Sequence, residues 1–252
     1  MVYMGSKNRI AKELIPIITK YLTEDRWYVE PFCGGCNMID KVNHQKRIAN
    51  DYNKYLVALF IALQQGVELP SEISKDEYYK VKDNKDDYPD WYVGFVGFVC
   101  SYRGKFFNGW IDKEVVQKNG KIRNRFVEQR SNLDAQRNNI KNITYSQGTY
   151  SRIKIPALSI IYCDPPYQDT TSYKNAEGFD HDSFWQWCRD MTHKGCDVLI
   201  SEYQAPSDFV CVWSKGINMN LSGGKGKTAV EKLFVHESIA HKYKQEVQIN
   251  LF

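Results

Sequence analysis

The 252-residue sequence has no apolar run long enough to cross a membrane. The first residues, 1–7, also lack the apolar core of a secretory signal peptide. No internal repeat and no low-complexity tract is visible. From these absences we expect a cytoplasmic protein without a membrane partner, and the ordinary 42% of hydrophobic residues predicts a buried core.

Cysteine is too scarce and too scattered for a disulfide framework. The chain has seven cysteines, an odd number, which suits free thiols in a reducing compartment. Cys33 and Cys36 have the spacing of metal ligands, but no second pair follows at zinc-finger distance. We therefore expect no metal site.

Charge is small overall but unevenly distributed. The formal net charge is +4, whereas residues 103–142 alone contain ten basic and four acidic residues. Such a block is typical of a surface that binds a polyanion. A solvated helical face is the competing interpretation.

The first 66 residues alternate between helical and extended patterns. Apolar spacing predicts a helix over 6–21, with Ser6 as a candidate N-cap, and another over 53–65 that stops at Gly66. Residues 27–30 and 47–50 have the pattern of short strands. This order favours a parallel, doubly wound α/β sheet.

The remaining chain divides at residue 142. Residues 67–142 are polar and rich in tyrosine, with a basic helix predicted over 124–140, and we interpret them as an insertion or small subdomain. After residue 142, strand patterns return in five places: 143–145, 158–162, 198–200, 210–212 and 233–235. A helix is predicted over 182–194, between the second and third of these strands, and Asp180 to Asp182 are expected to form a loop and N-cap before it.

The tetrapeptide Asp164-Pro165-Pro166-Tyr167 is the strongest candidate for a catalytic site. It follows the apolar run 158–162, which predicts a strand buried on both faces. Open α/β sheets place their ligand crevices at this carboxyl end. The two prolines fix φ and have no N–H, so the turn is stiff and presents acceptors rather than donors.

This combination suits chemistry on an exocyclic amino group. The nitrogen lone pair of such a group is delocalised into the ring, and hydrogen bonds accepted from both amino hydrogens localise it. An ionised Asp164 accepts only, and the Pro165 carbonyl is a second acceptor. Tyr167 is expected to stack on the base. The competing interpretation is a proline-rich turn that an aspartate caps.

Six segments in a fixed order carry a family resemblance. They are Tyr3-Met4-Gly5-Ser6-Lys7, Glu30-Pro31-Phe32-Cys33-Gly34-Gly35, Asn50-Asp51, Asp164 to Tyr167, and Ser201-Glu202-Tyr203 with Val230 to Phe234. Together they resemble the D12 class of site-specific DNA adenine N6-methyltransferases, the Dam type, over nearly the whole chain. Residues 102–108 further resemble versions from phages and prophages.

The resemblance implies a Rossmann-like methyltransferase sheet with an inserted, mainly helical target-recognition subdomain. The expected parts are a cofactor-binding part over 1–66, the insertion over 67–142, and a catalytic part with a tail over 143–252. The implied reaction moves a methyl group from S-adenosylmethionine to N6 of a flipped-out adenine in double-stranded DNA, in a bacterial or phage-infected cell. We expect a monomer.

The same resemblance assigns the cofactor residues. Asp51 is expected to bind the cofactor ribose and Lys7 its methionine carboxylate; a helix-capping Asp and a surface Lys are the structural alternatives. Cys36-Asn37 depart from the family, since many members continue this loop with Gly and Ser. A positive φ there would suit Asn better than Cys. The full expected set is Tyr3, Lys7, Pro31, Phe32, Cys33, Gly34, Gly35, Asp51 and Asp164.

The basic block is the expected DNA contact surface. Phosphate contacts position a duplex without specifying its sequence. The aromatic run 106–110 either inserts into DNA or forms the core of the subdomain. The candidate DNA contacts are Arg103, Lys105, Asn108, Lys121, Arg123, Arg125 and Arg130.

The tail Gln248-Ile249-Asn250-Leu251-Phe252 carries a separate hypothesis. It resembles a short peptide by which bacterial proteins dock on the replication sliding clamp, and apolar anchors on an extended tail suit groove binding. A last edge strand or a frayed end is the competing interpretation.

Four alternative functions stay open on the sequence. Glutamine methylation of proteins uses a related motif that begins with Asn, but it gives no reason for the basic insertion. Methylation of RNA is compatible with the charge, because both nucleic-acid backbones are anionic. Cytosine N4 methylation uses the same physics, although those enzymes typically carry Ser in place of Asp164. A non-catalytic DNA-binding protein would explain the charge but not the acceptor turn.

Overall fold

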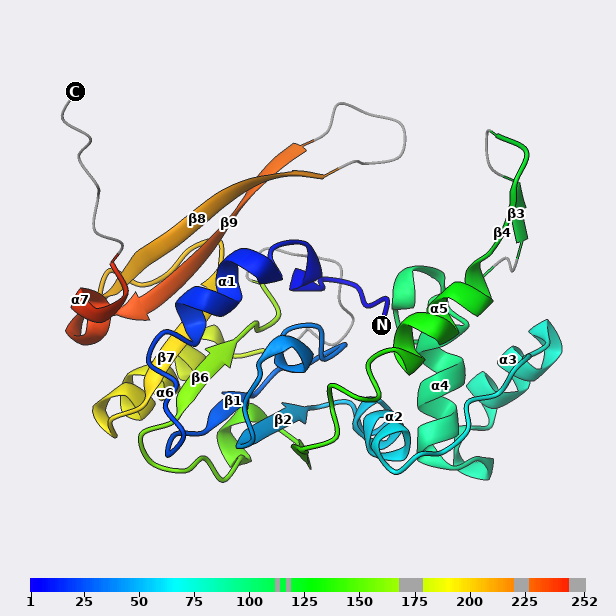
Figure 1. Ribbon diagram of the computed structural model, residues 1–252, viewed down its shortest axis with the longest axis horizontal. Helices are drawn as coiled ribbons and strands as arrows, with labels where there is room; N and C mark the ends of the chain where they lie inside the picture. The colour runs from blue at the N-terminus through cyan, green and yellow to red at the C-terminus, as the bar shows by residue number, and fades with distance from the viewer. Residues whose placement is uncertain (112–113, 117–118, 168–178, 220–226, 245–252) are drawn as a thin grey trace. The chain divides into compact units, whose positions relative to one another are not determined.

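The computed structural model describes residues 1–111, 114–116, 119–167, 179–219 and 227–244 (Figure 1). The chain forms two compact units. The first contains Met1–Pro16 and Phe32–Ile153, and the second contains Ile17–Pro31 and Lys154–Phe252. The short N-terminal elements are η1 (Lys7–Arg9) and α1 (Ala11–Ile18). Ser6 caps η1 as predicted, by accepting the Asn8 N–H.

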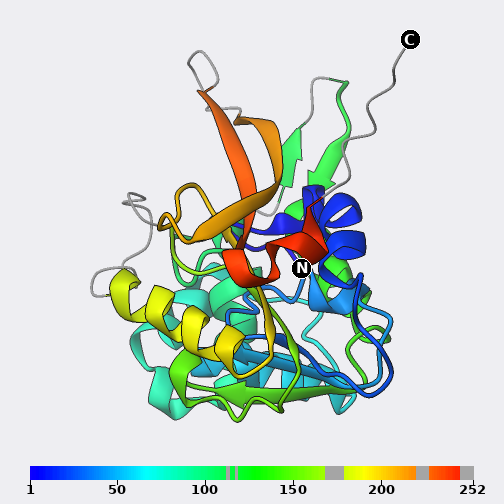
Figure 2. The same ribbon diagram turned by 90° about the vertical axis from the view of Figure 1, so that its left-hand side faces the viewer.

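Five neighbouring strands form the sheet of the second unit. β1 (Tyr28–Glu30), β6 (Ile160–Cys163) and β7 (Asp197–Glu202) pair in parallel in that order. β9 (Lys227–His236) pairs antiparallel with β7, and β8 (Phe209–Met219) pairs antiparallel with β9. Figure 2 shows how β8 and β9 twist together as a long hairpin. Every residue of β6 and β7 is buried, as expected of parallel strands covered on both faces.

The crossover from β6 to β7 contains α6 (His181–His193). Its N-cap is Asp180, whose side chain accepts the Ser183 N–H at 2.9 Å, so the predicted cap is confirmed. The helix packs against β7 and β9. Its buried face contains Phe184, Trp185, Cys188, Met191 and Thr192.

A buried ionic cluster fixes the N-terminal end of β7. Asp197 accepts from Arg26 at 3.0 Å, from Lys242 at 2.9 Å and from the Tyr243 hydroxyl at 3.0 Å. Burial alone would raise the pKa of Asp197. The hydrogen bonds from Lys242 and Arg26 outweigh it and hold the pKa below its ordinary value. The cluster ties α7 (Ala240–Tyr243) to the start of β7.

The first unit contains a third parallel pair. β2 (Arg47–Asp51) runs beside β5 (Ile143–Gln147) in a continuous five-residue register. α2 (Lys54–Gln64) follows β2, and Asn53 caps it by accepting the N–H groups of Tyr55 and Leu56. The predicted α/β class with a mostly parallel sheet is confirmed. Three short 3-10 turns complete the regular structure outside the proposed insertion: η2 (Ile39–Lys41), η5 (Tyr150–Arg152) and η6 (Glu237–Ile239).

The proposed insertion, residues 67–142, lies within the first unit and is mainly helical. It contains α3 (Lys75–Asp83), η3 (Lys85–Asp87), α4 (Asp90–Val99), η4 (Tyr102–Gly104) and α5 (Arg125–Asp134). A two-stranded hairpin, β3 (Glu114–Val116) and β4 (Ile122–Asn124), precedes α5. Asn124 caps α5, which agrees with the predicted start of this helix. The helix ends at Asp134, however, and not near residue 140.

Two other sequence expectations are wrong. The insertion is not polar throughout, because residues 93–99 of α4 are all buried. Two glycines and several β-branched residues hide this helix from propensity arguments, and packing against α2 overrides them. Leu158 is also outside β6, since it is 57% exposed and has a φ of +60°. Among the described residues, no helix has the length and apolar character to cross a membrane.

The contact between α2 and α4 depends on a missing side chain. A Cβ at Gly94 would lie 2.1 Å from the Tyr55 carbonyl oxygen. Backbone cannot move aside as a flexible side chain can, so the two helices approach this closely only with glycine at this position.

Gly94→Ala therefore tests packing against helix propensity. Propensity alone would stabilise the variant by about 1 kcal/mol, whereas overpacking typically costs about 1–3 kcal/mol. Because the clash is with backbone, we expect a net loss in the free energy of unfolding, measured by urea denaturation. Ser131→Ala, at an exposed position of α5, is the control and should be close to neutral. A stabilised Gly94→Ala would contradict the close helix contact.

Candidate active site

The candidate catalytic turn leaves the sheet where β1 and β6 end side by side. These strands are parallel, with Tyr28 opposite Ile160 and Val29 opposite Ile161. Pro31 and Asp164 consequently emerge from the same edge of the sheet. Pro165 is buried, while Asp164 and Tyr167 are half-buried. The turn is therefore packed against the protein at Pro165 and partly accessible to solvent at Asp164 and Tyr167.

The side chain of Tyr167 is held at two points. Its hydroxyl donates to Glu231 Oε2 at 2.8 Å. Its ring lies edge-on to that of Tyr203, with centroids 4.6 Å apart and an interplanar angle of 81°. Burial raises the pKa of Tyr167, and the carboxylates of Asp164 and Glu231 raise it further, so the hydroxyl stays a donor at neutral pH.

Beneath the turn, β6 is bonded through side chains to β7. Tyr162 and Ser201 share a hydrogen bond at 2.8 Å inside the core. Burial raises the pKa of Tyr162, and three neighbouring carboxylates add to the effect. These carboxylates are Asp164, Glu30 and Glu231. The region around the turn is therefore electronegative.

Glu30 is a buried acid at the end of β1, 2% exposed. It accepts the Tyr28 hydroxyl at 2.7 Å. Burial and the Glu30 carboxylate together raise the pKa of Tyr28. Glu30 stood in the glycine-loop motif of the sequence, but its contribution to the charge near the turn is visible only in the folded chain.

In the first unit, Asp51 organises the predicted glycine loop. One carboxylate oxygen accepts the Gly34 N–H at 3.0 Å and the other accepts the Asn53 N–H at 2.9 Å. Burial raises the pKa of Asp51, opposed by these backbone hydrogen bonds. Each oxygen has two lone pairs, so Asp51 keeps acceptor capacity for ribose hydroxyls. The residue thus caps the turn before α2 and also shapes the loop.

Tyr3 lies directly on the same loop. A Cβ at Gly34 would come within 2.7 Å of the Tyr3 ring, and one at Gly35 would come within 2.6 Å of the Tyr3 Cβ. Gly34 also has a φ of +46°, where side chains are disfavoured. The structure therefore brings the N-terminal aromatic and the two glycines together.

Cys36 has a positive φ, the left-handed conformation that suits Asn better than Cys. Its φ is +54° and its side chain is fully buried. Asn37 instead uses its amide to hold the chain start, donating to Ser6 Oγ at 2.8 Å. No group of three or more potential metal ligands occurs among the residues that the structure describes.

Gln136, just beyond α5, connects the insertion to this loop. Its amide donates to the Gly35 carbonyl at 3.2 Å and to Asp40 Oδ2 at 2.9 Å, and the residue is 5% exposed. Nothing in the sequence indicated this contact, because 101 residues separate the partners. Lys7 is also buried, at 7% exposed. A buried lysine is not the surface residue of the structural alternative.

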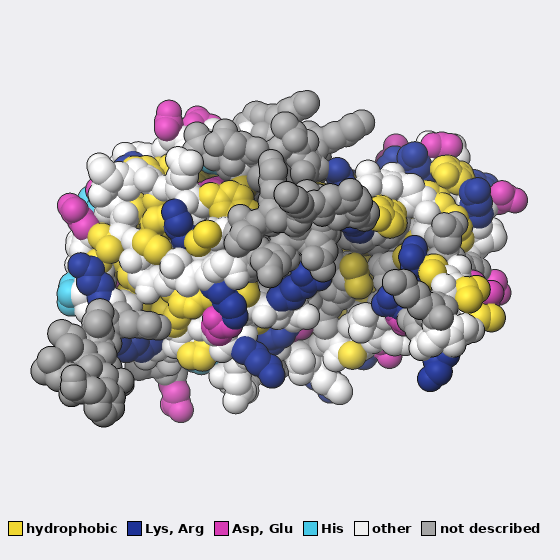
Figure 3. Space-filling view, turned by 90° about the horizontal axis from the view of Figure 1, so that it is seen from above, with side chains coloured by type: hydrophobic (Ala, Val, Ile, Leu, Met, Phe, Trp, Pro, Cys, Tyr) yellow, Lys and Arg dark blue, Asp and Glu magenta, His cyan; other side chains and the backbone are white. Residues whose placement is uncertain are grey.

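The expected DNA contacts differ in how available they are. Four of them are exposed: Arg103, Asn108, Lys121 and Arg123. Lys105, Arg125 and Arg130 are half-buried. Arg103 has a φ of +60° and stacks its guanidinium 5.3 Å from the Tyr102 ring centroid. In the space-filling view, basic side chains recur between hydrophobic ones on the displayed face (Figure 3).

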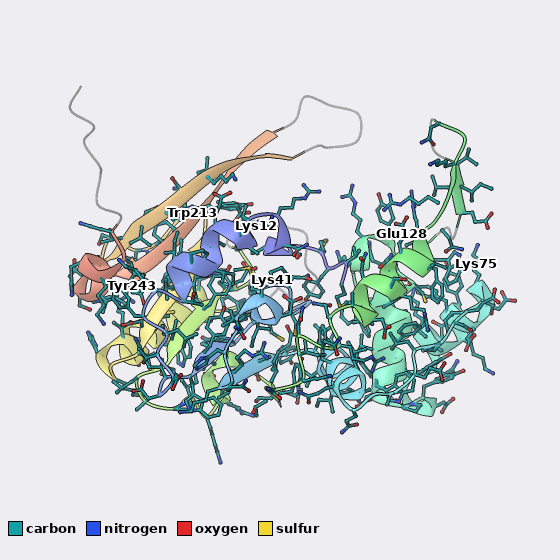
Figure 4. All side chains as sticks on the ribbon, in the orientation of Figure 1. Lys12, Lys41, Lys75, Glu128, Trp213 and Tyr243 are labelled. Carbon is teal, nitrogen blue, oxygen red and sulfur yellow. The ribbon has the colours of Figure 1, made fainter. Side chains whose placement is uncertain are left out.

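Two of these arginines have protein partners. Arg130 donates to the carbonyls of Pro70 and Leu69 at 2.9 and 3.1 Å, which fixes the start of the insertion against α5. Arg123 forms an exposed ion pair with Glu128, labelled in Figure 4. Exposed pairs contribute little stability, so Arg123 can exchange this partner for a phosphate.

The aromatic run 106–110 belongs to the core of the insertion. Phe107 and Trp110 pack on the buried Tyr78 with ring centroids 5.3 and 5.4 Å apart. Phe106 packs on Phe98 at 4.9 Å. Of the two interpretations from the sequence, the structure supports the core.

Exposed apolar residues occur instead on the hairpin. Val116 and Ile122 are register partners on β3 and β4, and they are 71% and 65% exposed. Lys121 and Arg123 flank Ile122 along the chain. Because successive side chains of a strand alternate between its faces, the aliphatic pair lies on one face of the hairpin and the two basic side chains project from the other.

These features define the class of the protein. A mostly parallel α/β sheet, a glycine loop and an acid at the end of β2 are typical of Rossmann-like enzymes. Residues 3–248 match the family model described as D12 class N6 adenine-specific DNA methyltransferase. The chain belongs to this family.

Curated relatives are distant in sequence. The type II methyltransferase M.FokI of Planomicrobium okeanokoites is 24% identical over 256 residues, covering 86% of this chain and 38% of the relative. The type II methyltransferase M.MjaIII of Methanocaldococcus jannaschii is 24% identical over 282 residues, covering 92% of this chain and 96% of the relative. The modification methylase StsI of Streptococcus sanguinis is 26% identical and is covered over 29% of its length. The chain thus spans less than half of two relatives and nearly all of the third.

The tail residues 248–252, which carry the clamp hypothesis, lie outside the described residues.

Arg130→Ala tests the structural role of this arginine. Loss of the guanidinium leaves two backbone carbonyls without their donor, and we expect a cost of about 1–3 kcal/mol in the free energy of unfolding. Lys121→Ala removes the same charge from an exposed position and should leave the melting temperature unchanged. Equal melting temperatures for the two variants would show that Arg130 has no structural role.

Proposed function

We propose that this protein transfers a methyl group from S-adenosylmethionine to the exocyclic N6 of adenine in double-stranded DNA. The observation that carries the proposal is the acceptor turn at the end of β6, with Asp164 half-buried in an electronegative region. Membership of an adenine-specific family supports the choice of adenine over cytosine. Relatives named type II methyltransferases support a role beside a restriction enzyme.

The turn activates the amino group by accepting its hydrogens. Asp164 and the Pro165 carbonyl each take one N–H, which concentrates the lone pair on nitrogen. As the N6–carbon bond forms, the sulfur–carbon bond of the cofactor breaks. The nitrogen then carries an extra proton, which leaves to Asp164 or to water.

The surrounding charge favours this step. Positive charge moves from sulfur to nitrogen during transfer, and fixed negative charge near the nitrogen stabilises the product side. Asp164 and Glu30 supply that charge. Tyr167 adds base stacking, which is worth about 1–3 kcal/mol per base on aromatic platforms.

The residues of the first unit fit S-adenosylmethionine. When bound, this cofactor supplies a methyl group on a sulfonium. Asp51 would accept from the ribose hydroxyls with its remaining lone pairs, and the buried Lys7 would pair with the carboxylate. Tyr3 and the loop residues 31–35 would line the nucleoside.

The insertion is the proposed DNA-binding part. The target base must leave the stack before it is methylated, at a cost of a few kcal/mol. We propose that Arg103, Lys121 and Arg123 hold phosphates while the Val116–Ile122 pair enters a groove. Apolar side chains that wedge between base steps partially unstack and kink a duplex. We propose that the enzyme acts on DNA in the cytoplasm of a bacterial or phage-infected cell.

Labelled cofactor and unmethylated duplex DNA of mixed sequence test the reaction. We expect label in N6-methyladenine after nucleoside analysis. Asp164→Ala should reduce transfer by at least about 10²-fold, because one preorganised acceptor is lost, while duplex binding stays within a few-fold. Label in N4-methylcytosine, or only in RNA, would contradict the proposed substrate.

Salt dependence tests the DNA surface. Removing Arg103 and Lys121 together should weaken duplex binding and reduce the slope of log K against log salt by up to about 1.8, or 0.9 for each lost phosphate contact. Lys75→Ala with Lys80→Ala is the matched control, since it removes the same charge from exposed positions on α3. An equal change in slope for both pairs would reject the assignment.

A further inference from the structure

Two prolines stiffen the backbone of the catalytic turn before Tyr167. Each proline fixes its own φ, and a residue before proline is restricted to extended conformations. Asp164 and Pro165 both precede a proline. Tyr167 is neither a proline nor followed by one, so neither backbone restraint acts on it, and its ring needs a restraint of another kind.

Tertiary contacts supply that restraint. Glu231 accepts the hydroxyl at the far end of the Tyr167 side chain, at 2.8 Å. Tyr203 packs edge-on at 4.6 Å and limits rotation of the ring plane. A ring held at its tip and at its side has one orientation, which is what stacking on a base requires.

Strand order explains why these residues meet. β7 lies between β6 and β9, and the last register pair of β7 and β9 is Glu202 with Lys232. β9 runs antiparallel to β7, so Glu231 precedes Lys232 on β9 where Tyr203 follows Glu202 on β7. Glu231 and Tyr203 therefore lie at the same level, just past the end of β7. The turn after β6 reaches the same edge of the sheet.

We propose that Glu231 is a positioning residue of the methyl-transfer reaction, acting through the hydroxyl of Tyr167. This inference rests on the proposed function. Glu231 holds the Tyr167 ring in the plane in which it stacks on the target base, so that the amino group meets Asp164. Its contribution is realised during transfer and not in the affinity for DNA or cofactor.

A purely structural role for Glu231 would act through a different neighbour. On the other side of β9, Glu231 is the register partner of Lys215 on β8. Opposite charges facing each other across strands stabilise a sheet modestly. Lys215→Ala removes that charge pair and leaves the Tyr167 contact intact, so it is the matched control.

The test is a double-mutant cycle on the single-turnover rate of label transfer to duplex DNA. Glu231→Ala should lower this rate about ten- to a hundredfold, with DNA and cofactor dissociation constants within about twofold of the unmodified protein. Glu231→Gln should recover most of the rate, because its amide oxygen accepts the same hydroxyl. Lys215→Ala should keep the full rate.

Tyr167→Phe provides the other edge of the cycle. It removes the donor but keeps the ring, so Glu231→Ala should cause little further loss in the Tyr167→Phe background. Independent, multiplicative losses would overturn the inference, as would an unaffected Glu231→Ala or a Glu231→Gln as slow as Glu231→Ala. Circular dichroism and thermal melting check folding, and Glu231→Gln serves if Glu231→Ala does not fold.

Failure of the proposed function gives a different result. If the unmodified protein transfers no label to adenine in duplex DNA, the reaction itself is wrong and the inference falls with it. If the unmodified protein is active and the cycle shows no coupling, only the role of Glu231 is wrong.

Discussion

The arrangement of this site depends on the burial of β6 between two parallel neighbours. β1 on one side and β7 on the other leave β6 no exposed edge, and all four of its residues are buried. The strand therefore ends at a fixed level, and the prolines that follow extend this rigidity into the turn. Asp164 acquires a defined position from the sheet and not from a flexible loop.

Around this fixed point, the side chains are positioned by neighbouring strands. The end of β1 brings Glu30, the end of β7 brings Tyr203, and β9 brings Glu231. The Tyr162–Ser201 hydrogen bond keeps β6 and β7 in register below them. Negative charge and ring orientation near the turn are thus properties of the sheet as a whole.

A second set of contacts connects the insertion with the glycine loop in the first unit. Gln136 follows α5, the helix that begins at the end of the basic hairpin, and donates to the carbonyl of Gly35. Asp51 holds the neighbouring Gly34 from the other direction. A displacement of α5 would therefore also shift the loop, because Gln136 and Gly35 are both buried and closely packed.

Much of the fold could be predicted from local patterns. The apolar run before Asp164, the capped helix after Asn53 and the cap at Asp180 each carry their signal within a few residues, and the structure has all three elements. α4 was not predictable in this way. Its glycines argue against a helix, and only tertiary packing explains them: Gly94 lies against Tyr55 of α2, and Gly97 lies against the rings of Phe106 and Phe107.

The sequence by itself determined the chemistry of the site: which carboxylate and carbonyl can accept amino hydrogens, and that the turn presenting them is stiff. These properties belong to residue types and to their immediate neighbours in the chain. The tertiary structure alone decided that the aromatic run 106–110 is core, that the exposed apolar pair is on the hairpin, and that Arg130 is bonded to Leu69 and Pro70. It also decided that Glu231 meets Tyr167. Such contacts join residues that are far apart in sequence, and they arise only when strand order and helix packing bring them together.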